Sequence, residues 1–138
     1  VPIKINEHLY LFCTPRENPN GNVLHIYKWS YKEKQFEFLK EISFKENIAR
    51  MSGSFFYYNN KLIRPTQECN FQYGHAVTLQ VTDITDFSFK EIRRIYSVHP
   101  KLNIGCHTFN SYKGVTVTDV LGFDRMWIRK MLKRFNLI

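Results

Sequence analysis

Short runs of alternating apolar and polar residues fill most of the chain, and this two-residue period predicts β-strands. Turn-forming residues separate the runs, and the strongest reversal signal is Asn20-Gly21. Ten strands are expected, at residues 1–5, 8–14, 23–29, 35–42, 51–58, 61–67, 76–81, 87–95, 105–110 and 115–120. The chain is therefore predicted to be all-β up to a short tail.

The strand pattern repeats along the chain. Hairpin turns fall near positions 7, 60 and 113, so they recur every 53 residues. Four strands in roughly 40 to 50 residues are typical of one β-propeller blade, whereas an immunoglobulin-like sandwich lacks such a repeat. We predict a partial β-propeller over residues 1–121, about 2.5 blades of four-stranded antiparallel sheet. The blades are expected at residues 1–47 and 48–100, with a half blade at residues 101–121.

The length of the chain leaves the predicted ring open. Propellers typically close with about four to eight blades, so 138 residues are too few to close a ring alone. Three arrangements remain open. The chain is a piece of a longer protein, which a first residue of Val1 in place of Met favours; a second copy completes the ring; or the blades form an open, twisted array.

The tail, residues 122–138, breaks the strand pattern. Apolar residues recur there every three to four positions while basic residues fill the other face, which predicts an amphipathic helix. The apolar positions are Phe123, Met126, Trp127, Met131 and Phe135, and the basic ones are Arg125, Arg129, Lys130 and Lys133. We expect the apolar face to pack against the sheets. A partner domain and an anionic membrane surface are the alternatives.

Charge and cysteine usage narrow the classes of partner. A net charge of +8 favours an anionic partner, but no known nucleic-acid-binding motif accompanies it, so no specific nucleic acid is predicted. No stretch approaches the roughly 18 apolar residues of a membrane span, and no signal peptide is recognisable.

The three cysteines, Cys13, Cys69 and Cys106, are too widely spaced for a disulfide framework or a zinc motif. We interpret them as buried small residues in a reducing, cytoplasmic compartment.

Polar chemistry is densest at residues 64–75, where Arg, Gln, Glu, Cys and His residues lie between two predicted strands. The motif Arg64-Pro65-x-Gln67-x-Cys69 and the later Gly105-x-His107-Thr108 resemble the propeller domain on the N-terminal side of glucosamine inositolphosphorylceramide transferases and in bacterial proteins related to sugar formyltransferases. That domain is similar to the five-bladed propellers of family 43-like glycoside hydrolases. The resemblance extends to about Leu121 and makes this chain the later half of such a ring. It implies a carbohydrate-related module that works beside a glycosyltransferase.

The candidate ligand-binding residues are Arg50, Arg64, Gln67 and His107. The innermost strands of neighbouring blades line the central channel, so these side chains are expected to converge there. Two guanidinium groups with an amide and an imidazole suit a sugar, a phosphate or a carboxylate, since arginine is a rigid bidentate donor. The alternative is that each side chain satisfies strand ends or backbone groups between blades.

Two acids, Glu68 and Asp119, lie beside the predicted inner hairpins and are the weak candidates for catalysis. A glycoside hydrolase or transferase needs a carboxylate pair, and the resemblance places Arg50 and Met51 where related enzymes carry an acid. Glu68 is more simply a salt-bridge partner of Arg64. The histidines show no metal-ligand spacing, so neither a metal nor a cofactor is predicted. A catalytic propeller and a non-catalytic scaffold remain the alternatives to sugar binding.

Overall fold

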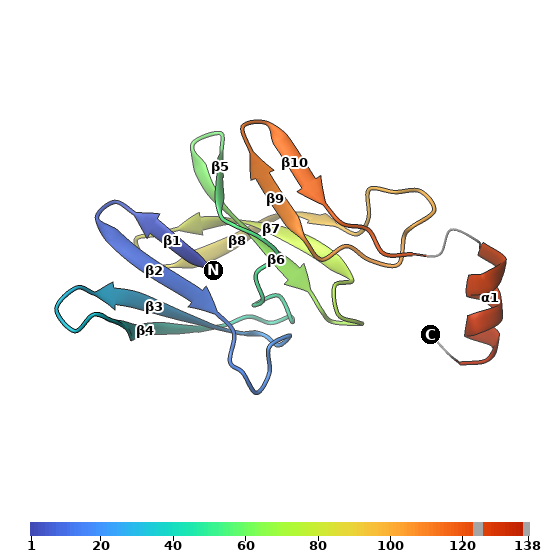
Figure 1. The fold of residues 1–138 in the computed structure, drawn as a ribbon, viewed down its shortest axis with the longest axis horizontal. Helices are drawn as coiled ribbons and strands as arrows, with labels where there is room; N and C mark the ends of the chain where they lie inside the picture. The colour runs from blue at the N-terminus through green and yellow to red at the C-terminus, as the bar shows by residue number, and fades with distance from the viewer. Residues whose placement is uncertain (123–125, 137–138) are drawn as a thin grey trace.

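The computed structural model describes residues 1–122 and 126–136. Two four-stranded antiparallel sheets and a two-stranded hairpin follow one another along the chain, and a short helix closes it (Figure 1). The mostly β fold and its four-stranded antiparallel sheets confirm the prediction at this level.

The first sheet is a meander in the order β1-β2-β3-β4. Its strands are β1 (Pro2–Ile5), β2 (His8–Cys13), β3 (Val23–Ser30) and β4 (Gln35–Ser43). Its strands contribute the buried side chains of Phe12, Leu24 and Ile26, which form one core cluster with Ala49 of the following segment. All four strands lie within a residue or two of their predicted positions.

The second sheet repeats this order as β5-β6-β7-β8. Its strands are β5 (Phe56–Tyr58), β6 (Lys61–Glu68), β7 (Ala76–Asp83) and β8 (Ser88–Ile95). The prediction that β5 begins at residue 51 is wrong. The Ser52 N–H donates to the Pro65 carbonyl of β6, while the Ser52 carbonyl accepts from the Phe109 N–H. This segment therefore bridges the second sheet and the hairpin.

The hairpin consists of β9 (Phe109–Tyr112) and β10 (Val115–Thr118). Its predicted start at residue 105 is wrong, because Gly105 forms an isolated bridge with Leu121 outside the hairpin.

The three hairpin turns share one local cause, which is a positive φ angle at Asn6, Asn59, Asn60, Lys113 and Gly114. Two-residue hairpin loops need such angles, which Asn and Gly adopt most readily.

Aromatic side chains pack the three sheets together. The rings of Phe12 and Phe55 lie 4.9 Å apart, centroid to centroid, and join the first sheet to the second. The rings of Phe56 and Phe109 lie 5.8 Å apart and join the second sheet to the hairpin. β9 of the hairpin contacts β5 of the second sheet, and Figure 1 shows the two side by side.

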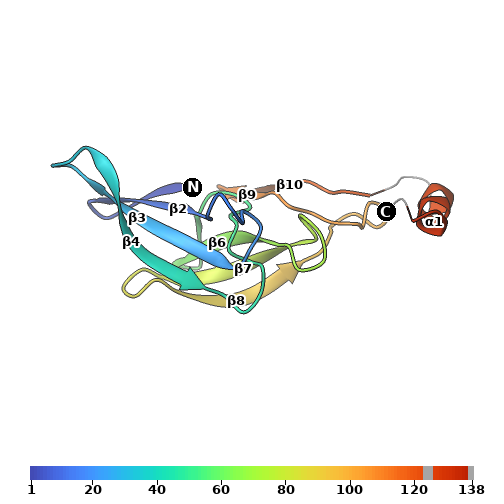
Figure 2. The ribbon, with the colours of Figure 1, turned by 90° about the horizontal axis from the view of Figure 1, so that it is seen from below.

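The tail forms the helix α1 (Met126–Arg134). The expectation that its apolar face packs against the sheets is wrong, since Trp127 is 60% exposed and Phe135 64%. Phe123 and Arg125 fall outside the described residues. Figures 1 and 2 place α1 at one end of the molecule, away from the sheets. Across residues 1–122 and 126–136, no helix has the length and apolar character needed to cross a membrane.

Candidate functional site

Loops from all three sheets meet at one place, which we call the Arg50 cluster: Asn20, Arg50, Tyr73, His107 and Asp119. Arg50 Nη1 donates a hydrogen bond of 3.2 Å to Asn20 Oδ1, in the loop between β2 and β3. The Arg50 guanidinium lies 5.4 Å from the ring centroid of Tyr73, in the loop between β6 and β7. The Tyr73 ring in turn lies 5.2 Å from that of His107, just before β9.

Backbone pairing with β6 positions Arg50. The Gln67 N–H donates to the Arg50 carbonyl at 2.8 Å, and Met51 bridges Thr66. Arg50 and Gln67 are thus cross-strand neighbours, whose side chains share one face of the pair. Gln67 is 6% exposed, and its Oε1 lies 4.0 Å from the Cys69 thiol. Gln67 is therefore buried beside Cys69, while Arg50, on the same face of the pair, is half-buried.

Gly74 allows the Tyr73 loop to lie against His107. Its φ is +65°, and a Cβ there would lie 2.5 Å from the Cβ of His107. Gly105 allows the same contact from the other side, because a Cβ added there would lie 2.3 Å from the Gly74 carbonyl oxygen. Two glycines from different sheets thus permit a contact that any larger residue would push apart.

Asp119 fixes the orientation of His107. Its Oδ1 accepts from the backbone N–H groups of His107 at 2.9 Å and Thr108 at 2.7 Å, and its Oδ2 pairs with His107 Nδ1. A carboxylate only accepts hydrogen bonds, so Nδ1 carries the proton and Nε2 remains for other partners. Burial alone would raise the pKa of Asp119. The hydrogen bonds from Thr108 and His107, with the charge of His107, lower that pKa overall.

Arg64 does not join the Arg50 cluster. It is 0% exposed between the first and second sheets, where its guanidinium lies 5.2 Å from the Phe44 ring and 4.8 Å from the Phe89 ring. Its donors reach Gln80 Oε1 at 2.7 Å, Met51 Sδ at 3.2 Å and the Ala49 carbonyl oxygen. Burial lowers the pKa of Arg64 to about 9. In this structure the side chain holds two sheets together and is not accessible to a ligand.

Strand alternation explains why the expected convergence of Arg64 with Gln67 is not found. Neighbouring residues of a strand point to opposite faces, so positions separated by an odd number diverge. Arg64, Thr66 and Glu68 share one face of β6, and Gln67 lies on the other together with Arg50 across the pair. One strand thus divides the predicted site residues between two environments.

Glu68 pairs with His75 and not with the predicted partner Arg64. Its Oε2 lies 2.6 Å from His75 Nδ1, and its Oε1 accepts from the Asn70 N–H at 2.6 Å. The Glu68 side chain is 1% exposed, whereas that of Asp119 is 33% exposed. Within the Arg50 cluster as defined, Asp119 is therefore the single carboxylate that solvent reaches.

Two residues of the Arg50 cluster were missed by sequence reasoning. Asn20 belongs to a predicted turn, and Tyr73 lies within the polar stretch of residues 64–75, but neither is among the predicted site residues. Tyr73 is 49% exposed and is the ring that connects Arg50 to His107. An aromatic residue inside a polar loop is the sequence signal that could have identified Tyr73. No local pattern identified Asn20.

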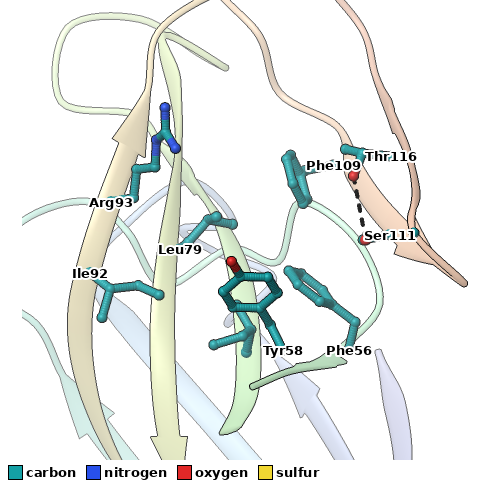
Figure 3. A pocket seen from close by; sticks show the side chains of 10 residues that line it. Phe56, Tyr58, Leu79, Ile92, Arg93, Phe109, Ser111 and Thr116 are labelled. Carbon is teal, nitrogen blue, oxygen red and sulfur yellow. Dashed lines mark hydrogen bonds between the residues drawn. The ribbon is translucent and has the colours of Figure 1, made fainter. Parts of the chain in front are cut away.

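A separate cavity of about 430 Å³ lies between the second sheet and the hairpin (Figure 3). Phe56, Tyr58, Leu79, Ile92 and Phe109 give it a largely apolar lining, and Arg93 stands at its edge. The polar side chains that line this cavity are those of Arg93, Tyr58, Ser111 and Thr116. The cavity is better explained as a gap beside a two-stranded hairpin.

The described residues contain no group of three or more His, Cys, Asp or Glu side chains arranged to hold a metal ion. Burial raises the pKa of the thiols of Cys13, Cys69 and Cys106. A scan against protein-family models, a search of curated proteins and a search of solved structures each found no match to this chain.

Proposed function

We propose that this protein is a carbohydrate-related β-propeller module that binds a sugar or sugar-phosphate at the Arg50 cluster. The observation that carries the proposal is the placement of a half-buried cation, Arg50, beside the exposed ring of Tyr73 and the imidazole of His107. The partners of Arg50 in the described part of the chain are neutral: an amide oxygen and an aromatic face.

The three side chains offer complementary chemistry to one small ligand. The planar guanidinium suits two oxygens of a phosphate, and the Tyr73 ring offers an apolar face beside a polar edge. His107 Nε2 is directed by the Asp119 contact at Nδ1 and supplies a further hydrogen-bonding position. Together they fit a phosphorylated sugar better than free phosphate, since the aromatic face has no role with an inorganic ion.

The propeller remains our proposal for the complete fold, with this chain as about 2.5 blades of a five-bladed ring. Edge composition supports it. The outer strands of the complete sheets carry charges typical of exposed edges, Glu37, Lys40 and Glu41 on β4 and Lys90, Glu91 and Arg93 on β8. The hairpin edge β10 is Val-Thr-Val-Thr, without charge. An uncharged edge of this kind suits an inner strand of a blade that pairs with a further strand. We propose that a longer chain or a second copy supplies that strand.

A glycoside hydrolase or transferase in the propeller channel is the competing function. That chemistry needs two carboxylates that face one sugar, roughly 5 to 10 Å apart. Glu68 is buried and paired with His75, which leaves Asp119 without a second exposed acid inside the cluster. Binding is therefore favoured over hydrolysis, and we place the module beside a glycosyltransferase that acts on the bound sugar.

Calorimetric titration with glucose 1-phosphate, glucose and inorganic phosphate tests this proposal. We expect glucose 1-phosphate to bind most tightly, and Arg50→Ala to weaken it about ten- to hundredfold, as for the loss of one charged hydrogen-bonding group. Tyr73→Ala should weaken the binding of glucose 1-phosphate and leave the binding of inorganic phosphate unchanged. The matched control is Arg93→Ala, which removes an exposed guanidinium at the apolar cavity.

The outcomes separate the possible functions. Unchanged binding in Arg50→Ala, or an equal loss in Arg93→Ala, would refute the assignment of the site. Absence of binding to all three probes would favour a non-catalytic scaffold. Release of glucose from a glucoside, abolished in Asp119→Asn, would favour the enzyme.

A further inference from the structure

The helix α1 presents an uncovered apolar stripe. Trp127 and Met131 of the helix and Phe135, the residue directly after it, are spaced four residues apart, so they follow one side. The Phe135 N–H still donates to the Met131 carbonyl at 3.2 Å. Their exposed fractions are 60%, 44% and 64%. Large aromatic and thioether side chains rarely remain in water as a continuous row unless another surface covers them.

Basic residues flank this stripe. Four of the nine residues of α1 are Arg or Lys, and the helix contains no acid. Lys130, Lys133 and Arg134 are exposed, and the last two lie in the final turn. A row of Trp, Met and Phe bordered by cations is the pattern of helices that lie flat in the headgroup region of an anionic bilayer.

We propose that α1 docks this protein onto an anionic lipid surface. Trp127 and Phe135 insert at the boundary between headgroups and acyl chains, where aromatic side chains are favoured, and Lys130, Lys133 and Arg134 contact lipid phosphates or carboxylates. Nucleic acid would use the cations but leave the apolar stripe in water. The apolar cavity at the hairpin is a poorer binding surface for this helix, because its charged residue, Arg93, is positive like the helix.

Co-sedimentation of the full chain with lipid vesicles tests this docking. We expect binding to vesicles with roughly 30% phosphatidylserine to be about tenfold or more stronger than to pure phosphatidylcholine, and to weaken when salt rises from about 0.1 M to about 0.5 M. In a Trp29→Phe background, Trp127 is the one tryptophan of the two in the chain that remains. Its emission should shift to shorter wavelength on binding. If this background fails to fold, sedimentation of the unmodified chain still decides.

Paired variants assign the contact to α1. Lys130→Glu with Lys133→Glu should abolish the preference for phosphatidylserine, and Trp127→Ala with Phe135→Ala should reduce binding to both vesicles. The matched control is Lys32→Glu with Lys34→Glu, the same charge change at two exposed lysines of the β3–β4 turn. Equal binding to both vesicle types, or equal loss in the control, would overturn the proposal. So would binding to poly(U) that exceeds vesicle binding and survives Trp127→Ala.

Discussion

Arg50 and Arg64 carry the same functional group in opposite environments. Arg64 is fully buried between two sheets, with Ala49, Gln80 and Met51 taking its hydrogen bonds. Arg50 is half-buried at the meeting point of three loops, where it contacts Asn20 and the Tyr73 ring. A buried cation with its donors satisfied stabilises the fold, whereas a partly exposed cation with neutral partners remains available to an anion.

The position along paired strands decides between these two roles. Met51 bridges Thr66, so Met51 faces the side of β6 that holds Arg64, and Arg50 faces the other side. A shift of one residue in this pairing would turn Arg50 toward the face of β6 that holds Arg64. Register, and not residue type, therefore separates the structural arginine from the proposed binding arginine.

The largest expected effect comes from removing the buried arginine. Arg64→Ala should lower the free energy of unfolding by about 3 to 5 kcal/mol, because it leaves a cavity and an unpaired Gln80 oxygen. Arg64→Met keeps apolar contact with Phe44 and Phe89 and should lose less. Urea denaturation measures both. Arg93→Ala, an exposed arginine of β8, should change stability by less than about 0.5 kcal/mol. A loss in Arg64→Ala as small as in this control would contradict the structural role.

A smaller effect is expected where the Tyr73 loop meets His107. Gly74→Ala should cost about 1 to 3 kcal/mol, from its positive φ and from the contact with the His107 Cβ. Gly114→Ala is the matched control, since its φ is +80° and no atom lies within 4 Å of the added Cβ. Chemical denaturation should show Gly74→Ala as the more destabilising variant, with weaker glucose 1-phosphate binding. Equal losses in the two variants would show that the loop contact is not constrained.

The smallest expected effect is a pH dependence at the Arg50 cluster. The pKa of Asp119 is lowered in the folded protein, so its stabilising contribution is present above the unfolded pKa of about 4 and is lost as the pH falls further. Its magnitude should stay below about 1 kcal/mol, because the side chain is one third exposed. The stability difference between the unmodified protein and Asp119→Asn should therefore shrink from neutral pH to about pH 3. A difference that grows toward acid would reverse the assigned sign.

Local patterns predicted the strands and turns, because hairpin turns and alternating residues depend on near neighbours. The starts of β5 and β9 were wrong because the segments before them form single bridges and not continuous ladders: Met51 bridges Thr66 of β6, and Gly105 bridges Leu121, beyond β10. Within the candidate site, Arg50 and His107 each contact the Tyr73 ring, whereas Arg64 is buried between the two sheets. The separation of Arg64 from Gln67 was available from their odd spacing in one strand. The approach of Asn20 and Tyr73 depends on how whole sheets pack, and no local sequence pattern determines that.

The central claim is that the exposed arginine of the pair belongs to a sugar-phosphate site. Mapping amide chemical shifts in ¹H–¹⁵N spectra during a titration with glucose 1-phosphate tests it most directly. The largest shifts should appear at Gly74, His107 and Thr108, next to the Arg50 cluster. Shifts confined to Ile92, Arg93 and Ser111, at the apolar cavity, would contradict the claim.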